Sequence, residues 1–317
     1  MKNILAVSIL LFLGLSAKCQ DRGLYTQYYM NWELVNPAFT GTDGEHEILF
    51  NYRNRWAGFP GNPKMISVAY DGLITDRVGL GAQLHTENIG ALNRLRLQLQ
   101  YAYHFGNEDL DMSIGLTTEY HQYSLDSDVL TSDFYDADDP IIMAAADNVS
   151  FFDMTLGVHG TYRDDLSFGV ALPSLIRTRI SDIAIEDFDD TLEESPLDYY
   201  FVYAAYRLDM TNGDYYLEPS LAVKKVRRID TTIDFNLKAG FLDDRLIGGL
   251  SYSTGAGNRF GFLVGTNIDN IQFIYSYDAS FLDYQEFNAG GHEITIGLTL
   301  GQMTNNTDQA TDATNKF

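Results

Sequence analysis

The sequence has 317 residues, with 44 acidic side chains against 21 basic ones, which gives a formal net charge of −23 at pH 7. A negative surplus of this size excludes nucleic acid as a partner, because the phosphate backbone would repel the chain. The single cysteine excludes a disulfide framework, so packing and hydrogen bonds must hold the fold.

Residues 1–19 have the three-part pattern of a secretory signal peptide. Lys2 supplies the basic start, Ile4–Leu15 is almost wholly apolar, and small side chains precede the bond after Cys19. We expect cleavage there, so that the mature chain lacks cysteine. An alternative is a lipoprotein cleaved before Cys19, which would then carry lipid, but Lys18 stands where lipoproteins have a small residue.

Residues 20–44 form an aromatic segment ahead of the first strand-like run. Asn36-Pro37 favours an extended or turn conformation, and Gly41 allows a sharp reversal. A tail this rich in aromatic rings would expose a large apolar patch, so we expect it to pack against the structure that follows. Its aromatic side chains are Tyr25, Tyr28, Tyr29, Trp32 and Phe39.

Residues 45–300 alternate between apolar and polar side chains with a period of two, which is the signature of β-strands. In residues 94–105 the leucines and aromatic rings alternate with Arg94, Arg96, Gln98 and Gln100. Such polar side chains cannot all face a dry core without partners, whereas a wet lumen accommodates them. The pattern therefore predicts strands with one face toward lipid and the other toward a water-filled interior.

Fourteen such segments can be counted, an even number as single-chain bacterial barrels require. Beyond the leader, no run reaches 18 apolar residues, so no membrane-spanning helix is expected. We therefore predict an all-β fold, a 14-stranded antiparallel outer-membrane barrel, with residues 20–44 inside it or against its periplasmic mouth. The segments are 46–55, 64–71, 77–87, 91–105, 109–122, 150–162, 165–172, 198–208, 214–225, 230–241, 244–254, 258–267, 270–279 and 291–300.

The connections between these segments support the same topology. Every second connection is a short turn rich in Asp, Asn or Gly, whereas all the long ones fall in the other set. Short periplasmic turns and longer surface loops are typical of bacterial barrels. After the last strand, residues 301–317 are polar and are expected to form a periplasmic tail.

Two of the long loops are strongly acidic. Neither 123–149 nor 181–198 contains a Lys or Arg, while apolar side chains stand among the acids of the first loop. This mixture is typical of a protein interface, so we expect the outer rim formed by residues 123–149 and 173–197 to dock a partner. The candidate docking residues are Phe134, Tyr135, Asp136, Asp138, Asp139, Ile141, Ile142, Glu186, Asp187, Asp189 and Asp190.

Signals for chemistry are weak, and we predict neither a catalytic nor a metal site. Calcium capture by the acidic loops is an alternative, although their spacing does not match an EF-hand loop. His85, His104 and His159 lie on polar faces of predicted strands, where a lumen metal site is also conceivable. No cofactor is expected.

Four short motifs stand close together between Gln27 and Pro63. They read Gln-Tyr-x-x-Asn, Asn-Pro-Ala-Phe-Thr-Gly, Tyr-Arg-Asn-Arg-Trp and Gly-Phe-Pro-Gly-Asn-Pro. In this order they resemble the PorP/SprF family of type IX secretion system outer-membrane proteins, although Arg55 replaces the usual Gln. The resemblance covers about residues 20–72. The residues that carry it are Gln27, Tyr28, Asn31, Asn36, Pro37, Ala38, Phe39, Gly41, Tyr52, Arg53, Trp56, Gly58, Phe59 and Pro63.

This resemblance implies a non-enzymatic role in type IX secretion and gliding motility. The acidic loops favour a SprF-like member that docks and anchors an exported adhesin through its C-terminal domain. One alternative is a PorP-like member that contacts the periplasmic ring and peptidoglycan. Others are a channel for small or hydrophobic solutes plugged by its N-terminal segment, and a surface enzyme. The expected partners are the adhesin, other secretion components and outer-membrane lipid.

Overall fold

The structure is a computed structural model. It describes residues 25–126, 148–176, 178–179, 199–210, 215–226, 231–255, 258–281 and 283–301. The predicted signal peptide, the C-terminal tail after Gly301 and all of the candidate docking residues in the acidic loops lie outside the described residues.

Nearly all described residues belong to one antiparallel sheet. Its strands are β1 (His46–Asn54), β2 (Lys64–Thr75), β3 (Val78–Ile89), β4 (Leu92–Asn107), β5 (Leu110–Leu125), β6 (Val149–Tyr162), β7 (Leu166–Leu172), β8 (Thr178–Arg179), β9 (Tyr199–Tyr206), β10 (Leu208–Asp209), β11 (Tyr215–Val226), β12 (Thr232–Phe241), β13 (Leu246–Thr254), β14 (Arg259–Ile268), β15 (Ile271–Ser280) and β16 (Gly291–Gly301). The two-residue β8 continues the pairing of β7 with β6, and β10 continues that of β9 with β11. The described residues therefore form fourteen barrel strands, as predicted.

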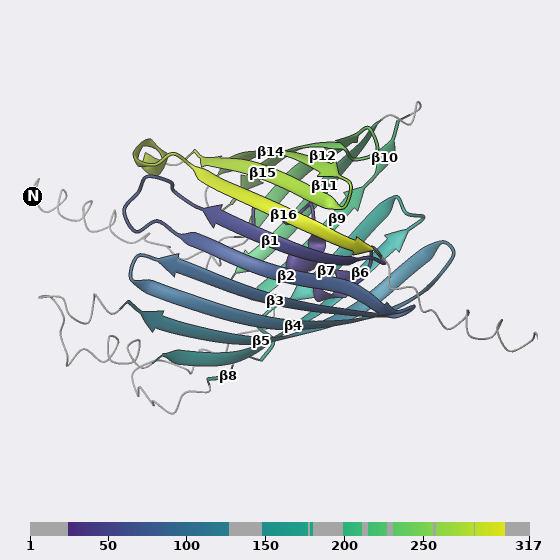
Figure 1. The fold of residues 1–317 in the computed structure, drawn as a ribbon, viewed down its shortest axis with the longest axis horizontal. Helices are drawn as coiled ribbons and strands as arrows, with labels where there is room; N and C mark the ends of the chain where they lie inside the picture. Colours follow the sequence, from purple (N-terminus) through teal and green to yellow (C-terminus); the bar gives the residue numbers. More distant parts are fainter. Residues whose placement is uncertain are drawn as a thin grey trace, which may run out of the picture.

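The sheet closes on itself because β16 pairs with β1 and β9 pairs with both β7 and β11. In Figure 1 the tilted strands run side by side, with hairpins such as β2–β3 and β4–β5 at one end. The β1–β2 and β15–β16 connections lie at the opposite end, where β5 and β7 also end and β6 and β9 begin. We call this opposite end the long-loop end. By the usual rule for bacterial barrels it faces outward.

The two faces of the wall follow the predicted alternation. Leu97 and Leu99 point outward, and Leu99 is 65% exposed, whereas Gln100 on the lumen side is only 9% exposed. The same split holds in β6 and β16, where Phe152 and Ile294 face outward. An outer face made of Leu, Ile, Phe and Tyr is what a lipid-exposed barrel surface requires.

The strand ends differ from the predicted ones by a few residues. The largest differences are in β2, which continues to Thr75, and β5, which continues to Leu125. Backbone pairing with the neighbouring strands extends β2 and β5 beyond the residues whose alternating side chains indicate a strand.

Among the described residues, no helix is both long enough and apolar enough to span a membrane.

The face assignment predicts opposite results for two neighbouring substitutions. Leu97→Lys places a charge among lipid-facing side chains and should lower the free energy of unfolding by roughly 2–4 kcal/mol. Gln98→Lys places the same charge toward the lumen, where water solvates it, and should cost little. Urea unfolding in lipid vesicles measures both variants. Equal losses would contradict the face assignment.

Candidate functional site

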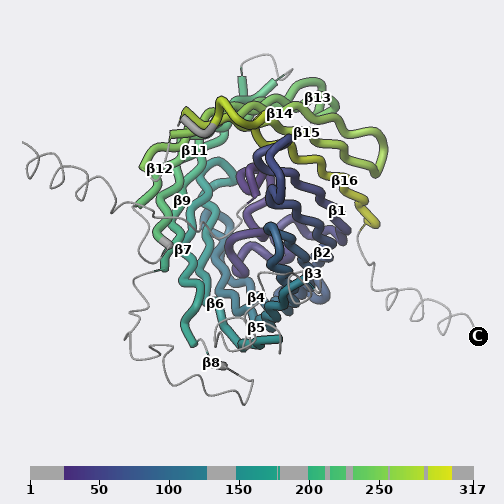
Figure 2. The backbone as a smooth tube through the Cα atoms, turned by 90° about the vertical axis from the view of Figure 1, so that its left-hand side faces the viewer, coloured from purple at the N-terminus to yellow at the C-terminus, as the bar shows by residue number. Residues whose placement is uncertain are grey.

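The N-terminal segment lies inside the ring of strands (Figure 2). Its two short 3-10 helices are η1 (Trp32–Leu34) and η2 (Pro37–Phe39), each capped by an asparagine. Asn31 accepts a hydrogen bond from the Glu33 backbone, and Asn36 accepts one from the Ala38 backbone at 3.0 Å. These caps fix the segment in turns, so that its side chains point at the surrounding strands.

At the long-loop end, the segment is tied to a buried ion cluster. Thr26 donates its backbone N–H to Glu293 at 2.7 Å and its hydroxyl to Asp278 at 2.9 Å. Arg53 on β1 lies 3.3 Å from Asp278 and 3.5 Å from Glu293. Gln27 adds hydrogen bonds to Ser276 and to the Glu293 carbonyl oxygen. We call Thr26, Gln27, Arg53, Asp278 and Glu293 the ion latch.

Below the ion latch, aromatic side chains fill the lumen. Trp32 stacks on Tyr203 with ring centroids 4.0 Å apart, and the Tyr28 ring meets Phe201 edge-on at 5.4 Å. Tyr28 also donates its hydroxyl to Asp234 at 2.7 Å, and Tyr25 lies 3.1 Å from His85. These rings are almost fully buried, so each hydroxyl requires the partner it has.

The Asn-Pro-Ala-Phe-Thr-Gly motif docks nearer the short-turn end. Asn36 donates to the Val158 carbonyl oxygen at 3.0 Å, and Ser113 donates to the Ala38 carbonyl oxygen at 2.5 Å. The Gly41 N–H donates to Asp71 at 2.9 Å, where its φ of +78° suits glycine. Phe39 packs edge-on against His159. His104 binds the Thr40 carbonyl oxygen, so two of the three histidines considered as metal ligands, His104 and His159, contact this motif, whereas His85 contacts Tyr25.

Three lumen-facing glycines make room for this motif. A methyl group on Gly115 would overlap the backbone nitrogen of Ala38, and one on Gly157 would overlap the side chain of Asn36. Gly115 and Gly157 are direct partners across β5 and β6, while Gly79 on β3 has the same relation to the Thr40 carbonyl group. We call Gly79, Gly115 and Gly157 the glycine floor. Sequence reasoning missed it, although all three occupy lumen positions of the alternating pattern.

The four motifs that resemble the PorP/SprF family stand close together in the sequence but lie at different places in the structure. Tyr52 is 42% exposed on the outer face of β1, away from the segment, whereas its neighbour Arg53 is buried in the ion latch. The Tyr52 side chain points outward because side chains alternate along β1 and those of Asn51 and Arg53 face the lumen.

The Trp56–Pro63 part of the motif forms the β1–β2 connection at the long-loop end. Ala57 exchanges backbone hydrogen bonds with Gly290 and Ala289 of the β15–β16 connection, each 2.8 Å long. Arg55 lies over the Trp56 ring at 5.4 Å, Gly58 has a φ of +87°, and Phe59 is 49% exposed. The Pro63 carbonyl oxygen accepts from the Arg55 N–H. This half of the motif ties two outer connections together.

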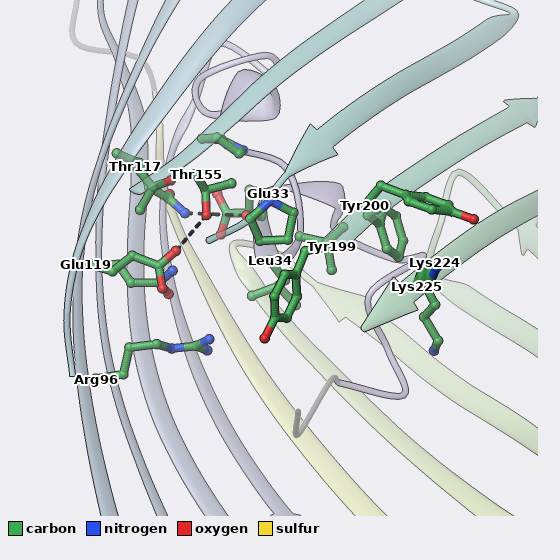
Figure 3. Close-up of a pocket in the computed structure, with 16 residues that line it drawn as sticks. Glu33, Leu34, Arg96, Thr117, Glu119, Thr155, Tyr199, Tyr200, Lys224 and Lys225 are labelled. Atoms are coloured by element: carbon green, nitrogen blue, oxygen red, sulfur yellow. Dashed lines mark hydrogen bonds between the residues drawn. The ribbon is translucent and has the colours of Figure 1, made fainter. Parts of the chain in front are cut away.

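A small pocket, partly open to solvent, lies between the segment and the wall. Figure 3 shows Arg96, Glu119 and Thr155 on one side, Lys224 on the other, and Glu33 and Leu34 between them. Glu119 accepts from Thr155 at 2.7 Å and lies 3.0 Å from His121. Because these positions lie in the halves of β4, β5 and β11 nearest the long-loop end, the pocket lies toward that end.

Glu33 lies at the base of this pocket and is 4% exposed. Burial raises the pKa of its carboxyl group well above the usual range, and the nearby Asp71 carboxylate raises it further. Among the described residues, no group of three or more His, Cys, Asp or Glu side chains is arranged to hold a metal ion. The acidic loops considered for calcium lie outside those residues.

Comparison with known proteins gives one family. The sequence model of the family described as "Type IX secretion system membrane protein PorP/SprF" matches residues 17–298. No curated protein matches the sequence.

Several solved outer-membrane proteins are similar in fold. Omp33 of Acinetobacter baumannii has a TM-score of 0.47 at 6% identity, over 80% of this chain and 96% of that one. The toluene transporter TbuX of Ralstonia pickettii has a TM-score of 0.47 at 11% identity, over 84% and 91%. The monoaromatic hydrocarbon channel CymD has a TM-score of 0.45 at 11% identity, over 88% and 92%.

Proposed function

This chain belongs to the PorP/SprF family of type IX secretion system membrane proteins, and we propose that it docks and anchors an exported surface adhesin. The chain is an outer-membrane β-barrel component of that system, with a structural or transport role rather than a catalytic one. Adhesin anchoring is the SprF-like branch of this role.

The observation that carries the proposal is the filled lumen. The segment between Tyr25 and Gly41 contacts strands all around the barrel, from β2 and β3 to β12, β15 and β16. A barrel filled in this way suits a rigid anchor better than an open passage. The pocket, and the strand ends that flank the acidic loops, lie toward the end expected to face outward, where an exported protein arrives. These features favour surface docking over contact with the periplasmic ring.

The acidic loops are the proposed gripping surface. Loop 123–149 combines seven aspartates with Phe134, Tyr135 and Ile141-Ile142. Acidic side chains around apolar anchors fit a partner with a basic face, and binding should be salt-sensitive.

Deleting residues 131–146 tests this proposal. The shortened barrel should still enter the membrane and keep its heat-modifiable gel mobility, because the deletion removes no described strand residue. Co-purification of the adhesin and its display on the cell surface should be lost. Deleting the tail after residue 305 is the matched control and should leave both unchanged. If the adhesin still co-purifies and reaches the surface, the loop is not the docking site, and a PorP-like periplasmic role or a channel takes precedence.

A further inference from the structure

Arg96 stands out among the charged side chains of the lumen pocket. Lys224 is 3.0 Å from Asp234, and Glu119 is bound by Thr155 and His121. Among the described residues, Arg96 makes no ion pair with a carboxylate, and its Nε atom is buried without a hydrogen-bond partner. Its charge also acts on the Tyr25 hydroxyl. The pocket therefore holds two basic side chains, Arg96 and Lys225, that form no ion pair with a described carboxylate, and of these two only Arg96 has a buried nitrogen without a hydrogen-bond partner.

The rest of the pocket has two chemical sides. The base is apolar where Leu34, Val35 and Pro37 of the N-terminal segment face Phe201 of β9. The β4–β6 wall is polar, with the amides and hydroxyls of Gln98, Gln100, Thr117 and Thr155.

We propose that this pocket binds a carboxylate attached to an apolar group, namely the free C-terminus of an exported polypeptide with an apolar last residue. The Arg96 guanidinium binds the terminal carboxylate with charge-assisted hydrogen bonds. The last side chain rests on Leu34 and Val35, which are contributed by the N-terminal segment.

A peptide fits this pocket better than a fatty acid, which offers the same carboxylate beside apolar carbon. The amide and hydroxyl groups of Gln98, Thr117 and Thr155 can form hydrogen bonds with a peptide backbone. An alkyl chain would displace water from these groups and offer them no hydrogen bond in return. The pocket also lies toward the outward end of the barrel, where secreted chains arrive. This inference rests on the proposed docking of an exported protein and specifies which part of that protein enters the lumen.

Calorimetric titration of the full-length barrel in lipid nanodiscs tests the inference. The probes are acetyl-Gly-Ser-Thr-Gly-Val-Leu with a free C-terminus, the same peptide as its C-terminal amide, and octanoate. The free acid should bind at least about tenfold more tightly than the amide, since a charge-assisted pair is lost in the amide. Arg96→Gln should abolish this difference, and Arg96→Lys should keep most of it, because a point charge remains.

Lys64→Gln is the matched control. It removes the same charge from an exposed side chain on the outer face of β2, and the acid–amide difference should persist. Heat-modifiable mobility shows that each variant is folded. Equal binding of acid and amide, or an unchanged difference in Arg96→Gln, would overturn the site. Octanoate binding that depends on Arg96 without peptide binding would overturn the peptide source.

The outcome is separable from that of the anchoring proposal. If the purified barrel prefers the free acid through Arg96 while adhesin display does not need residues 131–146, the pocket stands and loop docking fails. If display needs the loop while acid and amide bind equally, the pocket assignment fails and loop docking stands.

Discussion

Replacing Gly115 and Gly157 together with alanine will expel the Asn36–Gly41 motif from the barrel wall while the fourteen strands stay paired. Each new methyl group occupies space now held by the segment, at the backbone of Ala38 and at the side chain of Asn36. Overpacking of a filled site typically costs about 1–3 kcal/mol, so the two changes together should cost roughly 2–6 kcal/mol of docking free energy. Neither the segment backbone nor a capping asparagine can move away without breaking its hydrogen bonds.

Chymotrypsin measures the result, because the segment carries several of its aromatic cleavage sites. Residues 25–41 should be protected in the parent protein and cleaved in the double variant. Conductance in planar bilayers should rise at the same time, since the expelled segment leaves the lumen open. Gly248→Ala is the matched control, because a methyl group there meets no atom within 4 Å. Unchanged protection in the double variant would show that the segment tolerates a second docked position.

Arg53→Met should destabilise the barrel by about 3–5 kcal/mol, the usual cost of leaving a buried charge without its partner. The Arg53 side chain is 2% exposed and Glu293 is fully buried, so the Glu293 carboxylate cannot recover its hydration. Loss of the guanidinium should also free Thr26, which hydrogen-bonds to the same two carboxylates. Urea unfolding in vesicles gives the loss in stability.

Two further variants sharpen this test. Adding Glu293→Gln to Arg53→Met removes one stranded charge and should restore part of the stability. Arg163→Met breaks the ion pair between Arg163 and Asp109, whose atoms lie 2.9 Å apart. The side chains of both residues are more than half exposed. That change should cost at most about 1 kcal/mol. Equal losses in Arg53→Met and Arg163→Met would mean that the latch contributes no more than a surface pair.

The strands and their faces could be predicted from the sequence because alternation is a local signal. Leu97 and Gln98 need only their neighbours along the chain to show which side each takes. The family resemblance, likewise, was carried by motifs between Gln27 and Pro63, and the match over residues 17–298 confirms it.

The candidate site depended on contacts that no local pattern contains. Glu293 stands 240 residues after Arg53, and nothing in either sequence window indicates the other. The glycine floor was invisible for a different reason. Gly115 and Gly157 contribute the absence of a side chain, which has meaning only once Asn36 and Ala38 are placed against them. The docking role of the acidic loops stays a prediction.

The ion latch also constrains how the chain reaches its native state. Thr26 and Glu293 are 267 positions apart, and Gln27 and Ser276 are 249 apart. Contacts this distant in sequence form late, because the entropy of closing so long a loop must be lost before they stabilise anything. Since β15 and β16 come last among the described strands, the first described residues cannot be secured until the seam between β16 and β1 is made. The latch thus joins the first described residues to the last described strands, and an incomplete barrel would leave its aromatic segment open to proteases.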